Sequence, residues 1–465
     1  MSIPKYRASN FLQYLLGSRL GGLLARGWLE KPILYLLQYW FFPVSRLWAA
    51  ARKANGSVDE FFLAVPMEPV ESERENIAKL LNTFEEKRHQ IAETEGQWRL
   101  KFFSADHCSS KELVEAEKMR IAHRNEYNAT RKKFGSLRKH VKSSVYDCFA
   151  SPEQALKLYS DDKKQDEDLF ARLDEMPEIS VSRSIEKRFS NDYWLSFDSP
   201  SAMLNDTVYA RVLEPKDVVN PPTLIFGHGI GVEFDHWRNL IDIVKYLPQL
   251  GIRVIRPEAP WHGRRVPDGF YGGEYFLSST PRGAFDFFTA QHQEWTVLMD
   301  WAKQTSSGPL AIGGSSLGAQ AAQMTSIRAN SWPKDKQPDA LFLMTHCSHL
   351  WEVALDGELA DIWNLHEPLK KLGWNRKSTE RWMQRLDPVG DPCMPADRVI
   401  SVLGREDAVT PYRSGRRLQK LWELPKDNCF IWPCGHFEVP MRMLSQRQPL
   451  TRLVEVFNSI RAEES

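Results

Sequence analysis

The chain has 465 residues, of which 42% are hydrophobic and 26% are charged, and its formal net charge at pH 7 is +1. These proportions exclude a chain that is disordered throughout, and the length allows two or three domains. Because the net charge is close to zero, nothing in the composition favours a nucleic acid as partner.

The first 54 residues (1–54) form a basic segment that is rich in aromatic side chains. Within the first fifty residues a single acid, Glu30, is outnumbered by six basic residues, Lys5, Arg7, Arg19, Arg26, Lys31 and Arg46. Leucines recur at helical spacing from Leu12 to Leu23, and aromatic rings follow at Tyr35, Tyr39, Trp40 and Trp48. Basic residues with apolar and aromatic neighbours favour peripheral binding to a membrane surface.

Two other interpretations of this segment stay open. It can pack on the rest of the protein as an amphipathic helix, or its first 29 residues can be an organelle transit peptide that is removed. The apolar run from Pro32 to Val44 is shorter than the ~20 residues of a spanning helix, and we expect Pro43 to end it. Since we find no secretory signal pattern, we expect an intracellular, cytoplasmic protein.

Residues 55–190 are polar and show repeated helix starts. Four serines have the spacing of a capping box: Ser57 with Glu60, Ser72 with Glu75, Ser109 with Glu112 and Ser151 with Gln154. A seven-residue apolar period lines one stripe of a helix at Ile77, Phe84, Ile91 and Trp98. We expect a helical hairpin packed on the rest of the protein, with a partner-binding arm as the alternative.

Residues 191–465 alternate strand and helix patterns. We expect a hairpin of two strands at Tyr193–Phe197 and Val208–Leu213. Six short apolar runs follow, at Thr223–Phe226, Arg253–Arg256, Leu310–Ile312, Ala340–Met344, Val399–Leu403 and Cys429–Trp432. Because helical stretches separate most of these runs, the region predicts an α/β fold with a mostly parallel sheet that is covered on both faces.

The most informative motif is Gly314-Ser315-Ser316-Leu317-Gly318, which follows an apolar run and precedes a helical stretch. A nucleophilic serine on a sharp turn between a strand and a helix needs small flanking residues, because larger side chains there would clash. We therefore predict Ser316 as the nucleophile and regard Ser315 as its variable neighbour.

A serine nucleophile needs a base and an acid after it. His436 follows the late run Cys429–Trp432, and no other histidine after Ser316 closes a last strand in this way. The histidine base in turn needs an acid that fixes its tautomer, and Asp407 lies in the loop after the apolar run Val399–Leu403. Glu406 is the neighbouring alternative.

A glycine-rich loop, Gly227 to Gly231, follows the first parallel strand pattern. Glycines there let the backbone approach a substrate, so we expect the N–H groups of Ile230 and Leu317 to form an oxyanion hole. We assign His228 and Gly229 of the same loop to substrate binding.

The order Ser316, Asp407, His436, with His228-Gly229 ahead of them, resembles the α/β-hydrolase superfamily over residues 191–465. The resemblance implies an eight-stranded, mostly parallel sheet, a covalent acyl-enzyme and a lid after the sixth strand. Residues 350–391 are helical and rich in Trp and Leu, and they fit that lid. The resemblance implies no cofactor and no metal.

Arg264 and Arg265 follow the strand pattern at Arg253, and ligands of such sheets bind beyond the carboxyl ends of the strands. We therefore assign this pair to an anionic group of the substrate, with pairing to Asp268 or Glu274 as the alternative.

Three potential metal ligands, His346, Cys347 and His349, lie close together in the sequence. Without a fourth ligand they favour the lining of a pocket over a metal site. The six cysteines lack the short spacings of zinc sites and favour free thiols.

These features together predict a serine hydrolase that cleaves a carboxylic ester with an apolar or lipid-like acyl group. Thioesterase, amidase and acyltransferase reactions use the same groups and stay open. A catalytically silent hydrolase fold that serves as a membrane-bound adaptor is the alternative from another class, which the complete set of triad residues disfavours.

Overall fold

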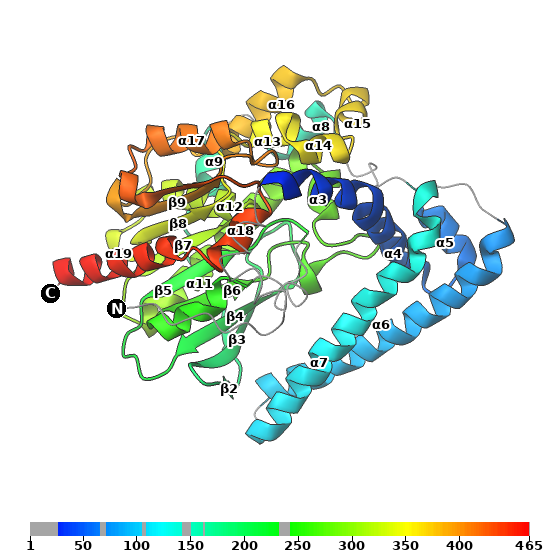
Figure 1. The fold of residues 1–465 in the computed structure, drawn as a ribbon, viewed down its shortest axis with the longest axis horizontal. Helices are drawn as coiled ribbons and strands as arrows, with labels where there is room; N and C mark the ends of the chain where they lie inside the picture. The colour runs from blue at the N-terminus through cyan, green and yellow to red at the C-terminus, as the bar shows by residue number, and fades with distance from the viewer. Residues whose placement is uncertain are drawn as a thin grey trace.

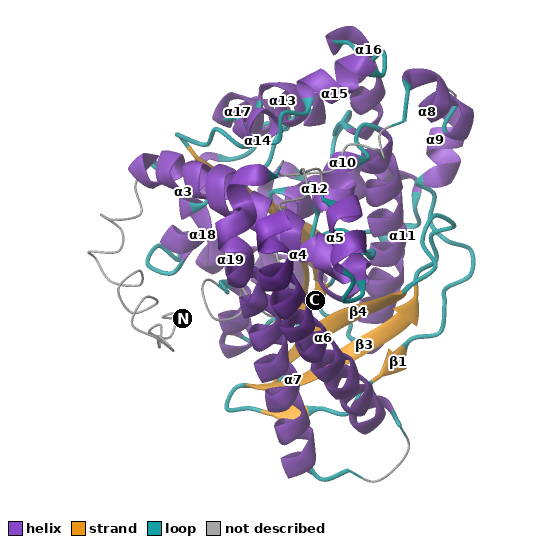
Figure 2. Cartoon of the chain, turned by 90° about the vertical axis from the view of Figure 1, so that its right-hand side faces the viewer, coloured by secondary structure: helices purple, strands orange, loops and turns teal. Residues whose placement is uncertain are grey.

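The computed structural model describes residues 27–65, 71–104, 108–141, 150–160, 163–231 and 242–464. A twisted sheet forms the centre of the molecule, helices cover both of its faces, and a long helical hairpin lies along one side (Figure 1). Turned by 90°, the view shows the hairpin crossing in front of the sheet (Figure 2). The predicted basic positions Lys5, Arg7, Arg19 and Arg26 lie outside the described residues.

Within the described residues, ten strands form one sheet in the order β1-β3-β4-β6-β5-β7-β8-β9-β10, with β2 paired to β3. The strands are β1 (Ser180–Val181), β2 (Ile185–Glu186), β3 (Ser190–Asp198), β4 (Thr207–Pro215), β5 (Thr223–Gly227), β6 (Arg253–Pro257), β7 (Leu310–Ser315), β8 (Ala340–Met344), β9 (Val399–Gly404) and β10 (Cys429–Trp432). β3 pairs antiparallel with β4 and β4 with β6, whereas all pairs from β6 to β10 are parallel.

All eight predicted strand positions are therefore confirmed. The sheet exceeds the expected eight strands by β1 and β2, which have two residues each. Two residues are too few for a periodic pattern, so the sequence gives no strand signal there.

The parallel strands are buried on both faces. In β5, Leu224 and Phe226 pack in one hydrophobic core, whereas Ile225 between them packs in the other. Successive strand residues point to opposite faces, so both faces need a helical cover. One face is covered by η6 (Val244–Leu250), α18 (Glu438–Met443) and α19 (Gln448–Glu464), and the other by α11 (Arg282–Thr305), α12 (Leu317–Arg328) and α17 (Tyr412–Leu421).

A helical insertion separates β8 from β9, after the sixth of the eight long strands. It consists of α13 (Leu350–Asp356), α14 (Glu358–Ile362), α15 (His366–Lys371), α16 (Arg376–Met383) and η10 (Gln384–Leu386). These helices lie together at the top of the molecule in Figure 1. Trp363, Trp374 and Trp382 anchor the insertion in the larger core.

The region before the sheet is helical, as predicted. It contains α5 (Val58–Ala64), η3 (Glu71–Glu73), α6 (Arg74–Phe103), α7 (Ser110–Thr130), η4 (Arg131–His140), α8 (Pro152–Leu158) and α9 (Lys163–Leu169). α6 and α7 pack against each other as a hairpin. The predicted stripe is buried, and its last member, Trp98, packs edge-to-face on Trp194 of β3 at a centroid distance of 5.5 Å.

Three of the four predicted helix caps are formed. Ser109 and Ser151 make complete capping boxes, and the Ser57 hydroxyl accepts the Glu60 N–H. The cap predicted at Ser72 is wrong, because Ser72 lies inside η3 and α6 begins only at Arg74.

A continuous helix runs through the first described residues. η1 (Gly27–Leu29) leads into α3 (Glu30–Leu36), a π-helical turn η2 (Leu37–Phe41) and α4 (Phe42–Ala54). The prediction that Pro43 ends the helix is wrong. Pro43 occupies the first turn of α4, directly after the π-helical turn, where its missing N–H leaves little of the hydrogen-bond ladder unmade.

One hydrophobic core contains residues from all three sequence segments, among them Trp48, Phe84 and Phe287. α4 is buried along most of its length, so this part of the basic segment packs on the protein as the alternative interpretation predicted. Arg46, predicted to face a membrane, is instead buried and paired with Glu274 at 2.7 Å. No helix in the described part of the chain is long and apolar enough to span a bilayer.

Candidate active site

Ser316 stands at a sharp turn between β7 and α12. Its backbone has φ 55° and ψ −116°, a combination that costs energy for a residue with a side chain. A Cβ atom on Gly314 would overlap Gly318, and one on Gly318 would overlap Gly227 of β5. The two motif glycines are therefore required by close backbone packing, which is the strand–turn–helix geometry of a nucleophile elbow.

Asp407 and His436 meet at the carboxyl ends of β9 and β10. His436 Nδ1 lies 2.9 Å from Asp407 Oδ2, and both side chains are buried. Asp407 Oδ1 accepts the N–H groups of Val409 and Thr410 at 3.0 and 2.8 Å. Because the carboxylate is held this way, it accepts the Nδ1–H of the imidazole and leaves Nε2 as the basic atom.

Several groups set the pKa of His436. Burial lowers it, but the carboxylates of Asp407, Glu30 and Glu438 raise it, and the pKa lies above the ordinary histidine value. The His436 imidazole is therefore held in a negative environment, which stabilises its protonated form.

A parallel sheet with a serine elbow after β7 and an acid–base pair after β9 and β10 decides the fold. The chain has the α/β-hydrolase fold.

No family model and no curated protein matches the sequence. Among solved structures, a cold-adapted esterase from an Arctic intertidal metagenomic library is 17% identical, with a TM-score of 0.38 over 58% of this chain and 96% of that chain. Acetyl xylan esterase 1 from Thermoanaerobacterium is 15% identical, with a TM-score of 0.42 over 67% and 96%. S-formylglutathione hydrolase from Agrobacterium tumefaciens is 12% identical, with a TM-score of 0.40 over 60% and 99%.

Ser316 belongs to the same edge of the α/β-hydrolase sheet as the acid–base pair. β7 is followed in the sheet by β8, β9 and β10, and parallel strands present their carboxyl ends on one side. Ser316 Oγ forms no hydrogen bond with His436 in the structure, so direct proton transfer between them stays a prediction. Catalytic hydrogen bonds often tighten only when substrate is bound.

Two threonines that the sequence analysis missed connect these groups. Thr345 Oγ1 accepts the Ser316 N–H at 3.1 Å, and the Thr345 carbonyl accepts the Thr410 hydroxyl at 3.1 Å. Thr410 Oγ1 also lies 2.8 Å from Asp407 Oδ2 and 3.2 Å from His436 Nδ1. Both threonines could have been found from the sequence, because Thr345 directly follows the apolar run of β8 and Thr410 lies three residues after Asp407.

The glycine loop lies against the predicted nucleophile. A Cβ atom on Gly229 would be 3.5 Å from Ser316 Cβ, so the loop backbone approaches the elbow closely. Leu317 is the first residue of α12, and its N–H has no acceptor within the helix. The predicted oxyanion donors, Ile230 and Leu317, therefore come from two backbone segments that meet at Ser316.

His228 holds this loop by two hydrogen bonds, and its predicted role in substrate binding stays a prediction. Its Nε2 accepts the Ala259 N–H at 3.2 Å, which leaves Nδ1–H to donate to the Gly229 carbonyl at 2.8 Å. Burial lowers the pKa of His228 to about 4, so the ring is neutral. A trans peptide points its C=O and N–H in opposite directions, so the bond to the Gly229 carbonyl also fixes the direction of the Ile230 N–H.

His262, which the sequence analysis did not assign, braces the next residue of the loop. Its Nε2 accepts the Gly231 N–H at 3.2 Å, and its Nδ1 lies 2.8 Å from the Pro260 carbonyl. Burial, together with the nearby His228, lowers the pKa of His262 to about 3. Two neutral histidines therefore hold the backbone of the predicted oxyanion loop.

Arg264 and Arg265 are both engaged with carboxylates of the protein. Arg265 is buried, and its guanidinium bonds Glu294 and Asp206 at 2.8 Å each. Arg264 pairs with Glu258 and reaches Glu95 of α6 at 3.1 Å.

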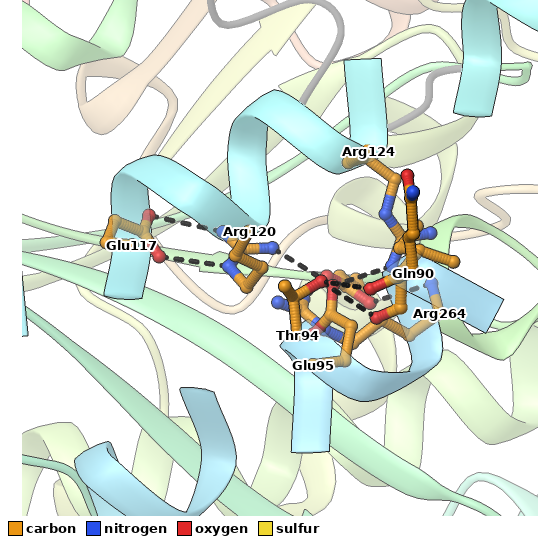
Figure 3. A network of polar contacts seen from close by, with 9 residues as sticks. Gln90, Thr94, Glu95, Glu117, Arg120, Arg124 and Arg264 are labelled. Carbon is orange, nitrogen blue, oxygen red and sulfur yellow. Dashed lines mark hydrogen bonds and ion pairs between the residues drawn. The ribbon is translucent and has the colours of Figure 1, made fainter. Parts of the chain in front are cut away.

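Glu95 is the centre of this network. Burial alone would raise its pKa, but Arg264, Arg124 and Arg120 lower the pKa to about 2 (Figure 3). The network ties the helical hairpin to the sheet. The carboxylate partners of the arginine pair differ from the predicted Asp268 and Glu274, and a role of the pair in substrate binding stays a prediction.

The three potential metal ligands point to separate partners. His346 Nε2 lies 2.6 Å from Ser401 Oγ, and His349 Nδ1 lies 2.7 Å from Asp387 Oδ2. The Cys347 thiol is buried and lies 3.4 Å from Gln320 Oε1. Each group is therefore used in local packing and hydrogen bonding.

Proposed function

We propose that the chain is a serine hydrolase that cleaves carboxylic esters with apolar, lipid-like acyl groups. The observation that carries the proposal is the hydrogen bond between Asp407 and His436, which orients a buried imidazole at the same sheet edge as the strained Ser316. A strained serine and an oriented base on one edge are what acyl transfer requires.

In the proposed reaction, Ser316 Oγ attacks the ester carbonyl while His436 Nε2 takes the hydroxyl proton. The Ile230 and Leu317 N–H groups stabilise the negative oxygen of the tetrahedral intermediate. The same proton then passes from His436 to the leaving alkoxide, and an acyl-enzyme forms. A water molecule, deprotonated by His436, releases the acid and regenerates the serine.

The preference for an apolar acyl group is inferred from the helical insertion above the sheet edge. Its first helix, α13, follows β8 and carries the half-buried Trp351, while Trp363 and Trp382 of the insertion are buried in the larger core. Apolar and aromatic walls with a few polar groups are typical of ester-binding pockets. Thioesters, amides and acyl transfer use the same groups, and a substrate panel would separate them.

Covalent labelling tests the proposal directly. A fluorophosphonate probe should label the wild-type chain, and peptide mass spectrometry should locate the label on Ser316. Ser316→Ala should abolish labelling and lower ester hydrolysis by about 10⁴-fold, the size of loss found for other triad serines.

Ser315→Ala is the matched control, because Ser315 is the adjacent hydroxyl and bonds Thr345 Oγ1 at 3.3 Å. It should keep labelling and most of the activity. If the label sits on another residue, or if the two variants behave alike, the nucleophile is assigned wrongly. A folded wild-type chain that takes no label would favour the silent adaptor.

A further inference from the structure

The outer side of the first described helices carries a row of exposed aromatic and apolar side chains. The row consists of Trp28 at 59%, Tyr35 at 66%, Leu36 at 56%, Tyr39 at 54% and Trp40 at 37% exposure. We call it the aromatic face. In the described part of the chain, Phe189 is the one other aromatic side chain with exposure of this size. Such a concentration on one helix side costs solvation free energy in water and marks an interaction surface.

A basic turn lies directly beside the aromatic face. η4 packs on η2 and α4, and the Arg138 guanidinium lies 4.6 Å from the centre of the Trp40 ring. Lys132, Lys133 and Lys139 of the same turn are exposed, and residues 131–141 contain no acid. The sequence alone placed this run far from the aromatic segment, and the tertiary structure joins them.

The two features together fit the headgroup layer of a bilayer. Tyr and Trp rings with a polar tip are favoured at this depth, and each Lys or Arg near an anionic surface strengthens the attraction to it. On the opposite side α3 packs against α14, whose Glu358 and Asp361 are exposed. These acids disfavour an anionic surface on the α14 side, so the contact is expected on the η4 side.

We propose that the aromatic face and the basic turn form a docking surface for a bilayer that contains anionic phospholipid. The surface differs from the one predicted from the sequence, since Arg46 and Trp48 are buried and the η4 lysines replace them. The proposal does not depend on hydrolysis, so the inactive Ser316→Ala chain should dock as the wild type does.

Flotation of full-length Ser316→Ala protein with vesicles tests this surface. The protein should float with phosphatidylcholine–phosphatidylserine vesicles at low salt and stay behind with phosphatidylcholine alone. Adding Lys132→Glu and Lys133→Glu should weaken binding by at least about 30-fold, since two cations are lost and two anions are gained. Tyr35→Ser with Tyr39→Ser should also weaken vesicle binding, because two rings of the aromatic face are lost.

Lys111→Glu with Lys118→Glu on α7 is the matched control, with the same charge change on exposed lysines away from η4. It should float like its parent. Loss of flotation in the control, or normal flotation of both test variants, would overturn the proposal. So would binding that disappears on deletion of residues 1–26 but withstands both test variants. If light scattering shows a dimer that the tyrosine changes break, while vesicles bind nothing, the occupant is a second copy.

A second, independent observation concerns the first residue of α3. The Glu30 carboxylate is buried between the loops that carry the acid and the base. Its Oε1 accepts the Ala408 N–H at 3.3 Å, and its Oε2 accepts the Phe437 N–H at 3.5 Å. Ala408 follows Asp407 and Phe437 follows His436. One side chain from the helical region therefore bridges both loops.

A third carboxyl group completes this arrangement. A Cβ atom on Gly435 would overlap Glu30 Oε2 and lie 2.8 Å from Glu438 Oε2, so the two carboxyl groups converge at that glycine. Two carboxylates this close do not both stay ionised. Burial raises the pKa of Glu30, and burial together with Glu30 raises the pKa of Glu438 to about 7. The titratable groups that face His436 are thus Asp407 from the β9 loop, Glu30 from α3 and Glu438 from α18.

We infer that Glu30 is a positioning residue that clamps the Asp407 and His436 loops together and adds negative charge next to the base. This inference rests on the proposed function. The aromatic face belongs to the same helix as Glu30, so docking and the clamp share α3.

Glu30→Gln keeps the shape of the side chain and removes its charge. The acidic limb of the pH profile of kcat/KM reports the free imidazole, which must be neutral to act as base. Because a negative neighbour raises the pKa of His436, its removal should move this limb to lower pH. A merely structural role would lower kcat/KM at every pH and leave the limb in place.

Glu406→Gln is the matched control, because Glu406 is exposed and makes no hydrogen bond to His436 in the structure. The acidic limb of the pH profile of kcat/KM should stay at the wild-type pH in Glu406→Gln. The same pKa should be followed by NMR of the His436 ring in the Ser316→Ala background, which needs no activity. An unmoved His436 pKa in Glu30→Gln would overturn the inference. If the wild type takes no fluorophosphonate label, the proposed function itself is contradicted.

Discussion

Asp407 and Glu406 are adjacent in the chain, but their side chains have different neighbours. Asp407 accepts the imidazole of His436 and two backbone N–H groups, whereas Glu406 lies against Gly27 at the surface. The geometry therefore favours Asp407 as the acid of the proposed triad, because Asp407 is buried behind His436. A buried, hydrogen-bonded carboxylate holds one tautomer, which an exposed one does not.

Asp407→Asn should lower kcat by about 10⁴-fold, because the amide N–H₂ faces Nδ1 and favours the wrong tautomer of His436. The backbone hydrogen bonds to Oδ1 can remain, so the fold should be kept. Glu406→Gln should change kcat little, since its side chain makes no bond to the imidazole. Steady-state hydrolysis of one ester with both variants checks the ranking, and the reverse order would move the acid to Glu406.

At the scale of elements, the helical insertion between β8 and β9 is part of the core. Trp363, Trp374 and Trp382 are buried with the residues of α11 and α12. Deleting residues 350–391 should therefore unfold the protein, because the core would lose these three rings. Substitution of a single residue therefore tests the predicted lid better than the deletion does.

Trp351 is the better target, since it is only half-buried and belongs to α13, which starts at the carboxyl edge of the sheet. Trp351→Ala should change the ratio of kcat/KM for long and short acyl esters more than it changes hydrolysis of an acetyl ester. Leu372→Ala, at an exposed position after α15, should leave that ratio unchanged. Equal ratios in both variants and the wild type would contradict a role of the insertion in acyl selection.

At the scale of the whole molecule, the helices before the sheet and the α/β-hydrolase domain share one core, and they are also joined by a buried ion pair. Arg46 of α4 and Glu274 of α10 (Glu274–Ser278) have side chains that are 1% and 0% exposed. Removing one partner of a buried pair leaves an uncompensated charge and typically costs 3–5 kcal/mol. We therefore expect the two regions to unfold together.

Glu274→Gln should lower the free energy of unfolding by about 3–5 kcal/mol. Glu75→Gln, which breaks the exposed pair with Lys79, should cost less than about 0.5 kcal/mol. Urea unfolding followed by circular dichroism and by tryptophan fluorescence checks both values, and the two probes should give one coincident transition. Two separate transitions would show that the helical region is an independent unit.

The sequence by itself determined the eight longer strands and the three candidate triad residues. The elbow at Ser316 is readable because Gly314 and Gly318 flank it at fixed spacing, and Gly314 is needed for the close approach of β7 and α12. Asp407 and His436 each follow a strand pattern within a few residues. Local chain geometry decides such features, so a single sequence carries them.

Only the tertiary structure decided which distant groups meet. Glu30 reaches the loops of Asp407 and His436 from the far end of the chain, and the lysines of η4 come to lie beside Trp40. Arg46 looked like a surface cation, yet it is buried because Glu274 compensates its charge. Pairing across hundreds of residues depends on how helices pack on the sheet, and no local pattern records that packing.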